Sequence, residues 1–225
     1  MVEQPPEGLD QYLKPTQLCD SNSEEIKKKA QELTKDASTP KETAMKIFYF
    51  VRDEIPYLLD LADVKASETL RKRLGECYHK TNLQVALLRA TGIPARYHRL
   101  AIRKEMFQGI FSDVVYRTVP EVAETRPYCE CYLSGKWIAC EALYDRELFE
   151  SMVEKGFPAM RQIPTIDWDG ENDLILDTPW IVKDFGTFSS YDDVFIDSAK
   201  QAGPRIIQRI GVYFSNRHTN KIRRR

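Results

Sequence analysis

One stretch in the middle of the chain limits the possible folds most. It covers residues 75–96 and reads GECYHKTNLQVALLRATGIPAR. Apolar residues recur there at helical spacing and predict a helix that starts near Cys77; they are Leu83, Ala86, Leu87 and Ala90. Gly92 can adopt the left-handed conformation that ends a helix, and Pro94 prevents the helix from continuing. From 95 to 102 apolar and polar residues partly alternate, so a strand should run back along the helix.

Helices are expected before this unit and a hairpin after it. Ser21 with Glu24 forms the pattern of a capping box for a helix that ends near Asp36. Thr39-Pro40 should start a second helix, which Pro56 ends. A short helix is expected over 68–74, and a helical turn and loop over 103–125. Two strands, over 128–132 and 136–143, are joined by a turn at Ser134-Gly135. Helices followed by antiparallel strands place the chain in the α+β class.

The second half of the sequence is less regular. A helix is expected over 145–154, an irregular acidic and aromatic stretch over 161–190, and a last helix from Gly203-Pro204, followed by a basic tail over 217–225. These patterns divide the chain into an N-terminal arm (1–20), a core (21–150), an extension of the same domain (151–202) and a C-terminal helix with its tail (203–225).

Composition excludes several classes of protein. The chain of 225 residues is 42% hydrophobic and 30% charged, with a net charge of −1. These values are ordinary for a soluble globular protein, and they give no electrostatic reason to expect a nucleic acid or a membrane as partner. The N-terminus lacks a signal peptide, so the five cysteines are interpreted as reduced thiols of a cytoplasmic protein. They do not combine with histidines at zinc spacing, and we expect neither a metal nor a cofactor. The oligomeric state stays open.

Cys77 is the candidate nucleophile. It opens the central helix, where the partial positive charge of the helix N-terminus favours a thiolate. Backbone N–H groups at a helix end can also stabilise an oxyanion. A buried apolar cysteine is the alternative interpretation of the same residue.

The sequence around Cys77 resembles the core motif of the transglutaminase-like superfamily. The fixed positions of that motif are a glycine, a cysteine, an apolar helix and a Gly-Ile-Pro-Ala-Arg segment. They correspond to Gly75, Cys77, Leu87, Leu88, Arg89, Gly92, Ile93, Pro94, Ala95 and Arg96. The later segment CECYLSGKWIACEALYD resembles the next two strands of the family through Glu130, Tyr132, Gly135 and Trp137. The resemblance covers roughly residues 40–150.

This resemblance implies a papain-like fold, in which a helix bearing cysteine at its N-terminus packs on an antiparallel sheet. It also implies a Cys-His-Asp triad that attacks a carboxamide or another acyl carbonyl. Cys77 matches the nucleophile, and Glu141 falls at the acidic position. Arg126 stands where the family has histidine, and arginine cannot act as a general base. It can still affect the pKa of the thiol as a fixed cation.

Other residues are weighed as substitutes for the missing histidine. His98 lies on the returning strand and is either a relocated catalytic group or a structural residue. Tyr128 is expected to share a strand face with Arg126, as a hydrogen-bond donor or as a packing residue. His79 follows Cys77 by two positions, so it should point away from the thiol.

Three functions remain open. The first is a cysteine-dependent enzyme that acts on an acyl or amide-type substrate, either a small molecule or a peptide. The second is a binding domain that has kept the fold and lost catalysis. The third is a lyase, isomerase or cyclase in which Arg126 binds a substrate carboxylate. The pair Cys77 and Glu141 favours an enzyme over an inactive domain.

Overall fold

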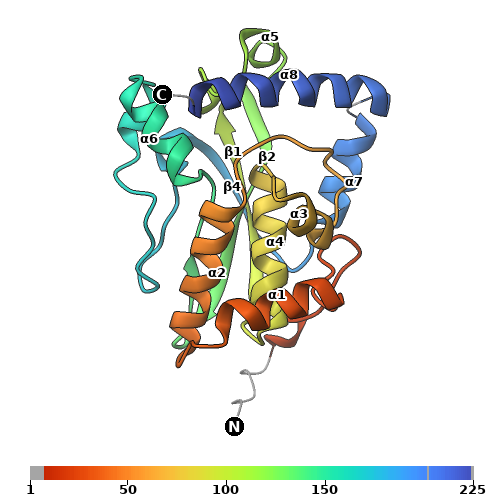
Figure 1. Cartoon of the computed structure of the whole chain (residues 1–225), viewed down its shortest axis with the longest axis vertical. Helices are drawn as coiled ribbons and strands as arrows, with labels where there is room; N and C mark the ends of the chain where they lie inside the picture. Colours follow the sequence, from red (N-terminus) through yellow and green to blue (C-terminus); the bar gives the residue numbers. More distant parts are fainter. Residues whose placement is uncertain (1–7, 202, 224–225) are drawn as a thin grey trace.

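A curved four-stranded antiparallel sheet and a set of helices form the molecule (Figure 1). The computed structural model describes residues 8–201 and 203–223. The strand order is β3-β2-β1-β4. The strands are β1 (Ala95–Arg103), β2 (Val122–Leu133), β3 (Lys136–Ala139) and β4 (Ile181–Phe188). The α-helices are α1 (Glu24–Thr34), α2 (Pro40–Glu54), α3 (Ala66–Lys72), α4 (Cys77–Ala90), α5 (Asp113–Tyr116), α6 (Arg146–Glu154), α7 (Asp192–Gln201) and α8 (Arg205–Arg223). Short 3₁₀ turns occupy Asp10–Tyr12, Lys104–Phe107, Ala159–Gln162 and Thr178–Trp180.

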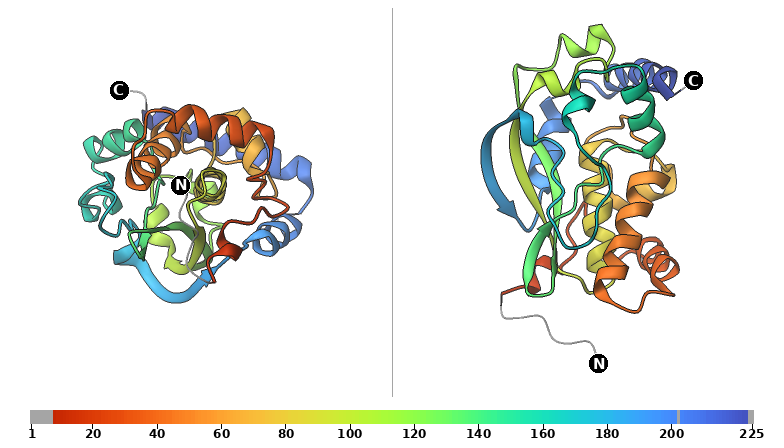
Figure 2. Two further views of the ribbon diagram at one scale, coloured as in Figure 1. Left: turned by 90° about the horizontal axis from the view of Figure 1, so that it is seen from below. Right: turned by 90° about the vertical axis from the view of Figure 1, so that its left-hand side faces the viewer.

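Helix α4 runs through the centre of the molecule. The sheet lies on one side of it, and α1 and α2 lie on the other (Figure 2). Every residue from His79 to Arg89 is buried, so the helix is surrounded by protein on all sides. Several of its buried polar side chains donate to backbone carbonyls, as burial requires. Lys80 Nζ donates to the carbonyls of Arg52 and Ile55 at 2.9 and 2.6 Å, and Gln84 donates to that of Cys140 at 2.8 Å.

The predicted central unit is confirmed. Helix α4 begins at Cys77, Gly92 has a φ of +82°, and β1 starts at Ala95. The hairpin turn is at Ser134 and Gly135, which both have positive φ, and it pairs Tyr132 with Trp137. The positive φ at both turn residues matches the right-handed twist of the two strands.

Several boundaries differ from the sequence prediction. Strand β3 ends at Ala139, whereas the strand was expected to run to residue 143. Ser23, and not Ser21, caps α1 by accepting from the N–H of Ile26 at 3.4 Å, and Ser21 is buried. Strand β2 starts at Val122, within the stretch expected to be a loop, because its first residues pair with the end of β1. The irregular stretch 161–190 contains β4, which pairs with β1. Helix α8 continues to Arg223, through most of the expected tail, because its last turn is anchored.

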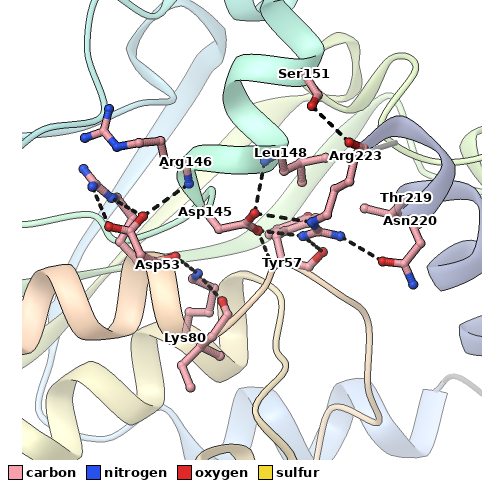
Figure 3. A network of polar contacts seen from close by, with 12 residues as sticks. Asp53, Tyr57, Lys80, Asp145, Arg146, Leu148, Ser151, Thr219, Asn220 and Arg223 are labelled. Carbon is pink, nitrogen blue, oxygen red and sulfur yellow. Dashed lines mark hydrogen bonds and ion pairs between the residues drawn. The ribbon is translucent and has the colours of Figure 1, made fainter. Parts of the chain in front are cut away.

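That anchor is a buried network around Asp145 (Figure 3). The carboxylate caps α6 by accepting from the N–H of Leu148 at 3.1 Å, and it accepts from the N–H of Tyr57 at 2.7 Å. Arg223 Nη2 donates to the same carboxylate at 2.6 Å and to the carbonyl of Tyr57 at 3.1 Å. One side chain thus joins α6, α8 and the segment that follows α2.

The N-terminal and C-terminal segments contribute to one hydrophobic core. Leu18 and Cys19 from the arm and Ile222 from α8 pack in the same cluster as α4 and the sheet. Residues 1–7 of the arm lie outside the described residues. None of the helices within 8–201 and 203–223 has the length and apolarity needed to cross a bilayer.

Candidate active site

Cys77 is the first residue of α4, and Glu76 caps that helix. The Glu76 side chain accepts from the N–H of Tyr78 at 3.2 Å, and the Cys77 thiol donates to Glu76 Oε2 at 2.7 Å. Of the five cysteines, Cys77 alone is not fully buried. Burial and the adjacent Glu76 carboxylate raise the pKa of Cys77 well above its ordinary value, and Arg126 opposes this. These two effects act against the thiolate that the helix end is expected to favour.

Glu76 also contacts a buried histidine on the same helix. His79 Nδ1 lies 3.1 Å from Glu76 Oε1, and His79 Nε2 lies 2.8 Å from the carbonyl oxygen of Leu61. Both ring nitrogens therefore face acceptors, which favours the imidazolium. Burial lowers the pKa of His79, but Glu76 raises it more, so the net shift is upward. Burial raises the pKa of Glu76, but His79 and Cys77 bring it below its usual value. Both shifts in pKa favour the charged forms of the two side chains.

Gly75 allows this arrangement. A Cβ atom placed on Gly75 would lie 2.6 Å from the Cβ of His79, which is closer than carbon atoms approach without displacement. The glycine two residues before the cysteine thus makes room for the histidine two residues after it. His79 does not touch the thiol itself, as expected, but Glu76 links the two side chains.

Arg126 lies in a buried ion-pair cluster. Its guanidinium contacts Glu141 Oε1, and its Nε lies 2.7 Å from Asp177 Oδ2. Nη1 donates to the carbonyl of Pro127 at 2.6 Å, and the residue is 3% exposed. Glu141 in turn accepts from the N–H of Leu176 at 2.6 Å. The structure thus brings the predicted residues Arg126 and Glu141 together. The positive charge of Arg126 acts to lower the pKa of Cys77.

Two carboxylates share the single positive charge of this cluster. Burial raises the pKa of Asp177 to about 8, although Arg126 opposes the shift, and burial also raises the pKa of Glu141. One of the two therefore keeps a proton at neutral pH, since a buried cluster with an excess charge is costly. Neither oxygen of Asp177 makes a hydrogen bond within the described residues, and the buried Tyr144 hydroxyl also has no hydrogen-bond partner there.

His98 and Tyr128 belong to a different group of side chains. Their rings stack with centroids 4.7 Å apart, on paired positions of β1 and β2. His98 Nδ1 lies 2.7 Å from Glu130 Oε1, and His98 Nε2 lies 2.7 Å from Asp184 Oδ1. Both ring nitrogens of His98 are thus engaged by carboxylates that do not contact Cys77.

Two members of the site were missed by the sequence interpretation. Glu76 had a usable signal, because it precedes the cysteine at the start of a helix and lies three residues before a histidine. Asp177 had none, because it reaches Arg126 from a loop that the pattern left irregular. Cys129 and Cys131, which were expected in the core, are fully buried there together with Cys140.

Known proteins share parts of this sequence and of this fold. The family model of the transglutaminase-like superfamily matches residues 27–142, just over half of the chain. A solved structure named "Putative Cysteine Protease" from Cytophaga hutchinsonii is 21% identical over 62% of this chain and 43% of its own, with a TM-score of 0.50. A "putative protease" from Parabacteroides distasonis is 19% identical over 60% of this chain and 25% of its own, with a TM-score of 0.40.

The chain spans less than half the length of either solved structure. A comparison with curated proteins finds no match. The likeness to the Cytophaga protein supports the fold, with a cysteine at the start of a central helix packed on an antiparallel sheet. Because the family model covers the helix with Cys77, both hairpin strands and Glu141, the chain belongs to the transglutaminase-like superfamily.

Proposed function

We propose that the chain is a cysteine-dependent enzyme for acyl or amide-type substrates, in which Glu76 accepts the proton of the Cys77 thiol and later donates it to the leaving group. The observation that carries this proposal is the continuous contact from the thiol to Glu76 at 2.7 Å and from Glu76 to His79 at 3.1 Å. It provides a proton acceptor within hydrogen-bond reach of the nucleophile, and a cation that orients the acceptor. These are the tasks that histidine and aspartate perform in the family triad.

The reaction balances with these groups. The Cys77 sulfur forms a bond to the acyl carbon while its proton passes to Glu76. The bond to the leaving nitrogen or oxygen then breaks, and Glu76 returns the proton to that atom. Water or another acceptor releases the acyl group by the reverse use of the same carboxylate. The N-terminus of α4 supplies partial positive charge for the oxyanion.

Arg126 has a supporting role in this proposal. Its guanidinium is enclosed by Glu141, Asp177 and the Pro127 carbonyl. This enclosure argues against the third hypothesis, in which Arg126 binds the carboxylate of a substrate. Its charge instead lowers the pKa of Cys77 from outside direct contact.

The substitution Glu76→Gln tests whether Glu76 acts as the base for Cys77. Removing the carboxylate charge should lower the pKa of Cys77, so iodoacetamide should alkylate the thiol faster at neutral pH. Loss of the proton acceptor should nevertheless reduce turnover of p-nitrophenyl acetate or a peptidyl p-nitroanilide about 10²–10⁴-fold. Glu130→Gln is the matched control, because Glu130 also pairs with a histidine but does not contact Cys77. If turnover in Glu76→Gln rises together with alkylation, Glu76 is not the base.

A binding domain without catalysis is the second candidate. The observation in its favour is that a buried arginine occupies the histidine position, while the thiol is held protonated. In that case the unmodified protein should turn over neither substrate. Arg126→His should then restore thiol-dependent turnover that a further Cys77→Ala abolishes. Turnover by the unmodified protein that Cys77→Ala abolishes would rule this candidate out.

A further inference from the structure

Helix α8 exposes most of its large apolar side chains at the surface of the molecule and does not bury them in the core. Nine large apolar residues are exposed in the described part of the chain, and five of them belong to α8, each at least 54% exposed. They are Ile206, Ile207, Ile210, Tyr213 and Phe214. Their spacing of one, four, seven and eight residues places them on one face of the helix. That face is therefore not used to build the core.

The opposite face of α8 is the one that packs on the protein. Its buried residues are Ser215, Thr219, Ile222 and Arg223. Asn216 fixes the middle of the helix by accepting from the N–H of Leu59 at 2.7 Å and donating to its carbonyl at 2.9 Å. Apart from Ile222, the inward-facing residues are thus polar, while the other isoleucines and the aromatic residues face outward. This is the reverse of the usual order.

The same helix is strongly basic. Helix α8 contains five Lys and Arg and no acidic residue, Arg224 and Arg225 follow it in the sequence, and all 34 Asp and Glu lie earlier in the chain. Arg205 pairs with Asp63, but no ion pair within the described residues involves Arg209, Arg217 or Lys221. These three line a hollow of about 560 Å³ along α8. A group of cations therefore accompanies the exposed apolar face.

We propose that α8 binds an anionic lipid surface and lies in the plane of that surface. Isoleucine and aromatic side chains would enter the boundary between headgroups and acyl chains, and Arg209, Arg217 and Lys221 would contact lipid phosphates. A second copy of the chain is a poorer occupant, because a two-fold contact would place these cations against their own copies. The net charge of the whole chain is near zero because acidic residues earlier in the chain offset the basic residues of α8.

The proposal also gives the bound molecule an orientation. Helix α8 lies along one end of the molecule, beside α5 and α6 (Figure 1). Arg223 binds the carbonyl of Tyr57, and Tyr57 forms a β-bridge with Gly75, two residues before Cys77. The end of the molecule that holds the thiol would therefore face the lipid.

Vesicle flotation tests the proposal with the full chain. The protein should bind vesicles that contain phosphatidylserine, bind pure phosphatidylcholine much less, and be released by added NaCl. Arg209→Gln/Arg217→Gln/Lys221→Gln should weaken binding roughly 5-fold per removed charge. Ile206→Ser/Ile210→Ser should weaken it independently of salt. The control Lys27→Gln/Lys28→Gln/Lys35→Gln removes three exposed charges elsewhere and should bind like the parent.

Three results would overturn the proposal. The first is no binding to phosphatidylserine vesicles by the parent protein. The second is equal loss of binding in the α8 variant and in the control with three substitutions, which would indicate nonspecific attraction. The third is a dimer in sedimentation equilibrium without lipid that Ile206→Ser/Ile210→Ser dissociates, which would assign the apolar face to a second copy. Because the α8 variants leave Cys77 and Glu76 intact, their turnover tests the proposed function separately.

Discussion

Replacing Arg126 by methionine should destabilise the fold strongly, and the loss should depend on pH. The substitution keeps an apolar chain of similar length but leaves Glu141 and Asp177 buried without their cation. Both carboxylates are nearly inaccessible, at 3% and 0% exposure. Removing one partner of such a buried pair typically costs about 3–5 kcal/mol of unfolding free energy. That loss is a large fraction of the net free energy of unfolding of a domain, which is about 5–15 kcal/mol.

The pH dependence follows from the two carboxyl groups. Without Arg126, the folded-state pKa values of Glu141 and Asp177 should rise further above their ordinary values of 4.5 and 3.8. An acid with a raised pKa in the folded state stabilises the fold least at high pH, because ionisation then favours unfolding. The deficit of Arg126→Met should therefore be largest near pH 8, should shrink as the pH falls, and should disappear only below the ordinary Asp pKa of 3.8, where both groups are protonated in the folded and in the unfolded state.

Urea denaturation at several pH values measures this deficit. The variant Arg126→Met/Glu141→Gln/Asp177→Asn should recover most of the lost stability, because no buried charge then lacks a partner. Arg71→Met is the control, since Arg71 forms an exposed ion pair with Glu25 and its loss should leave the urea midpoint unchanged. A deficit below about 1 kcal/mol, or one that does not vary with pH, would refute the assignment of a charged buried cluster.

Three further outcomes are expected. Limited iodoacetamide labelling should modify Cys77 before the buried cysteines, and its rate should keep rising with pH because the pKa of the thiol is raised; earlier labelling of Cys19 in a peptide map would contradict this. Gly75→Ala should displace His79 and lower the urea midpoint, whereas Gly211→Ala in α8, where space is open and φ is not positive, should not lower it. Burial lowers the pKa of Lys80 to about 7, so stability should fall as pH decreases from 10 toward 7, and Lys80→Met should remove this slope.

The local signals in the sequence were sufficient for the central unit of the fold. Helix periodicity, Gly92 and Pro94 placed α4 and β1 correctly, and the turn at Ser134-Gly135 placed the hairpin. These features depend on residues near one another in the chain, where steric and capping preferences decide the conformation. Strand β4 has no comparable signal, because only its pairing with β1 makes it a strand.

The candidate site was predicted less completely than the fold. Cys77, Arg126 and Glu141 were assigned to the candidate site because the family motif fixes their positions. Burial and the Glu76 carboxylate, which raise the pKa of Cys77, depend on tertiary packing that a helix-end argument omits. Asp177 approaches Arg126 from 51 positions further along the chain, so no spacing rule could connect the two residues.

The bond between Asp145 and Arg223 has a consequence for the order in which this protein forms during translation. Asp145 is synthesised 78 residues before Arg223, and its carboxylate is 4% exposed once α6 and the segment at Tyr57 have packed around it. Until Arg223 leaves the ribosome, that packing would bury a charge without its cation, which is unfavourable. The region around Asp145, at the cysteine end of α4, is therefore expected to complete its folding only after α8 has been synthesised.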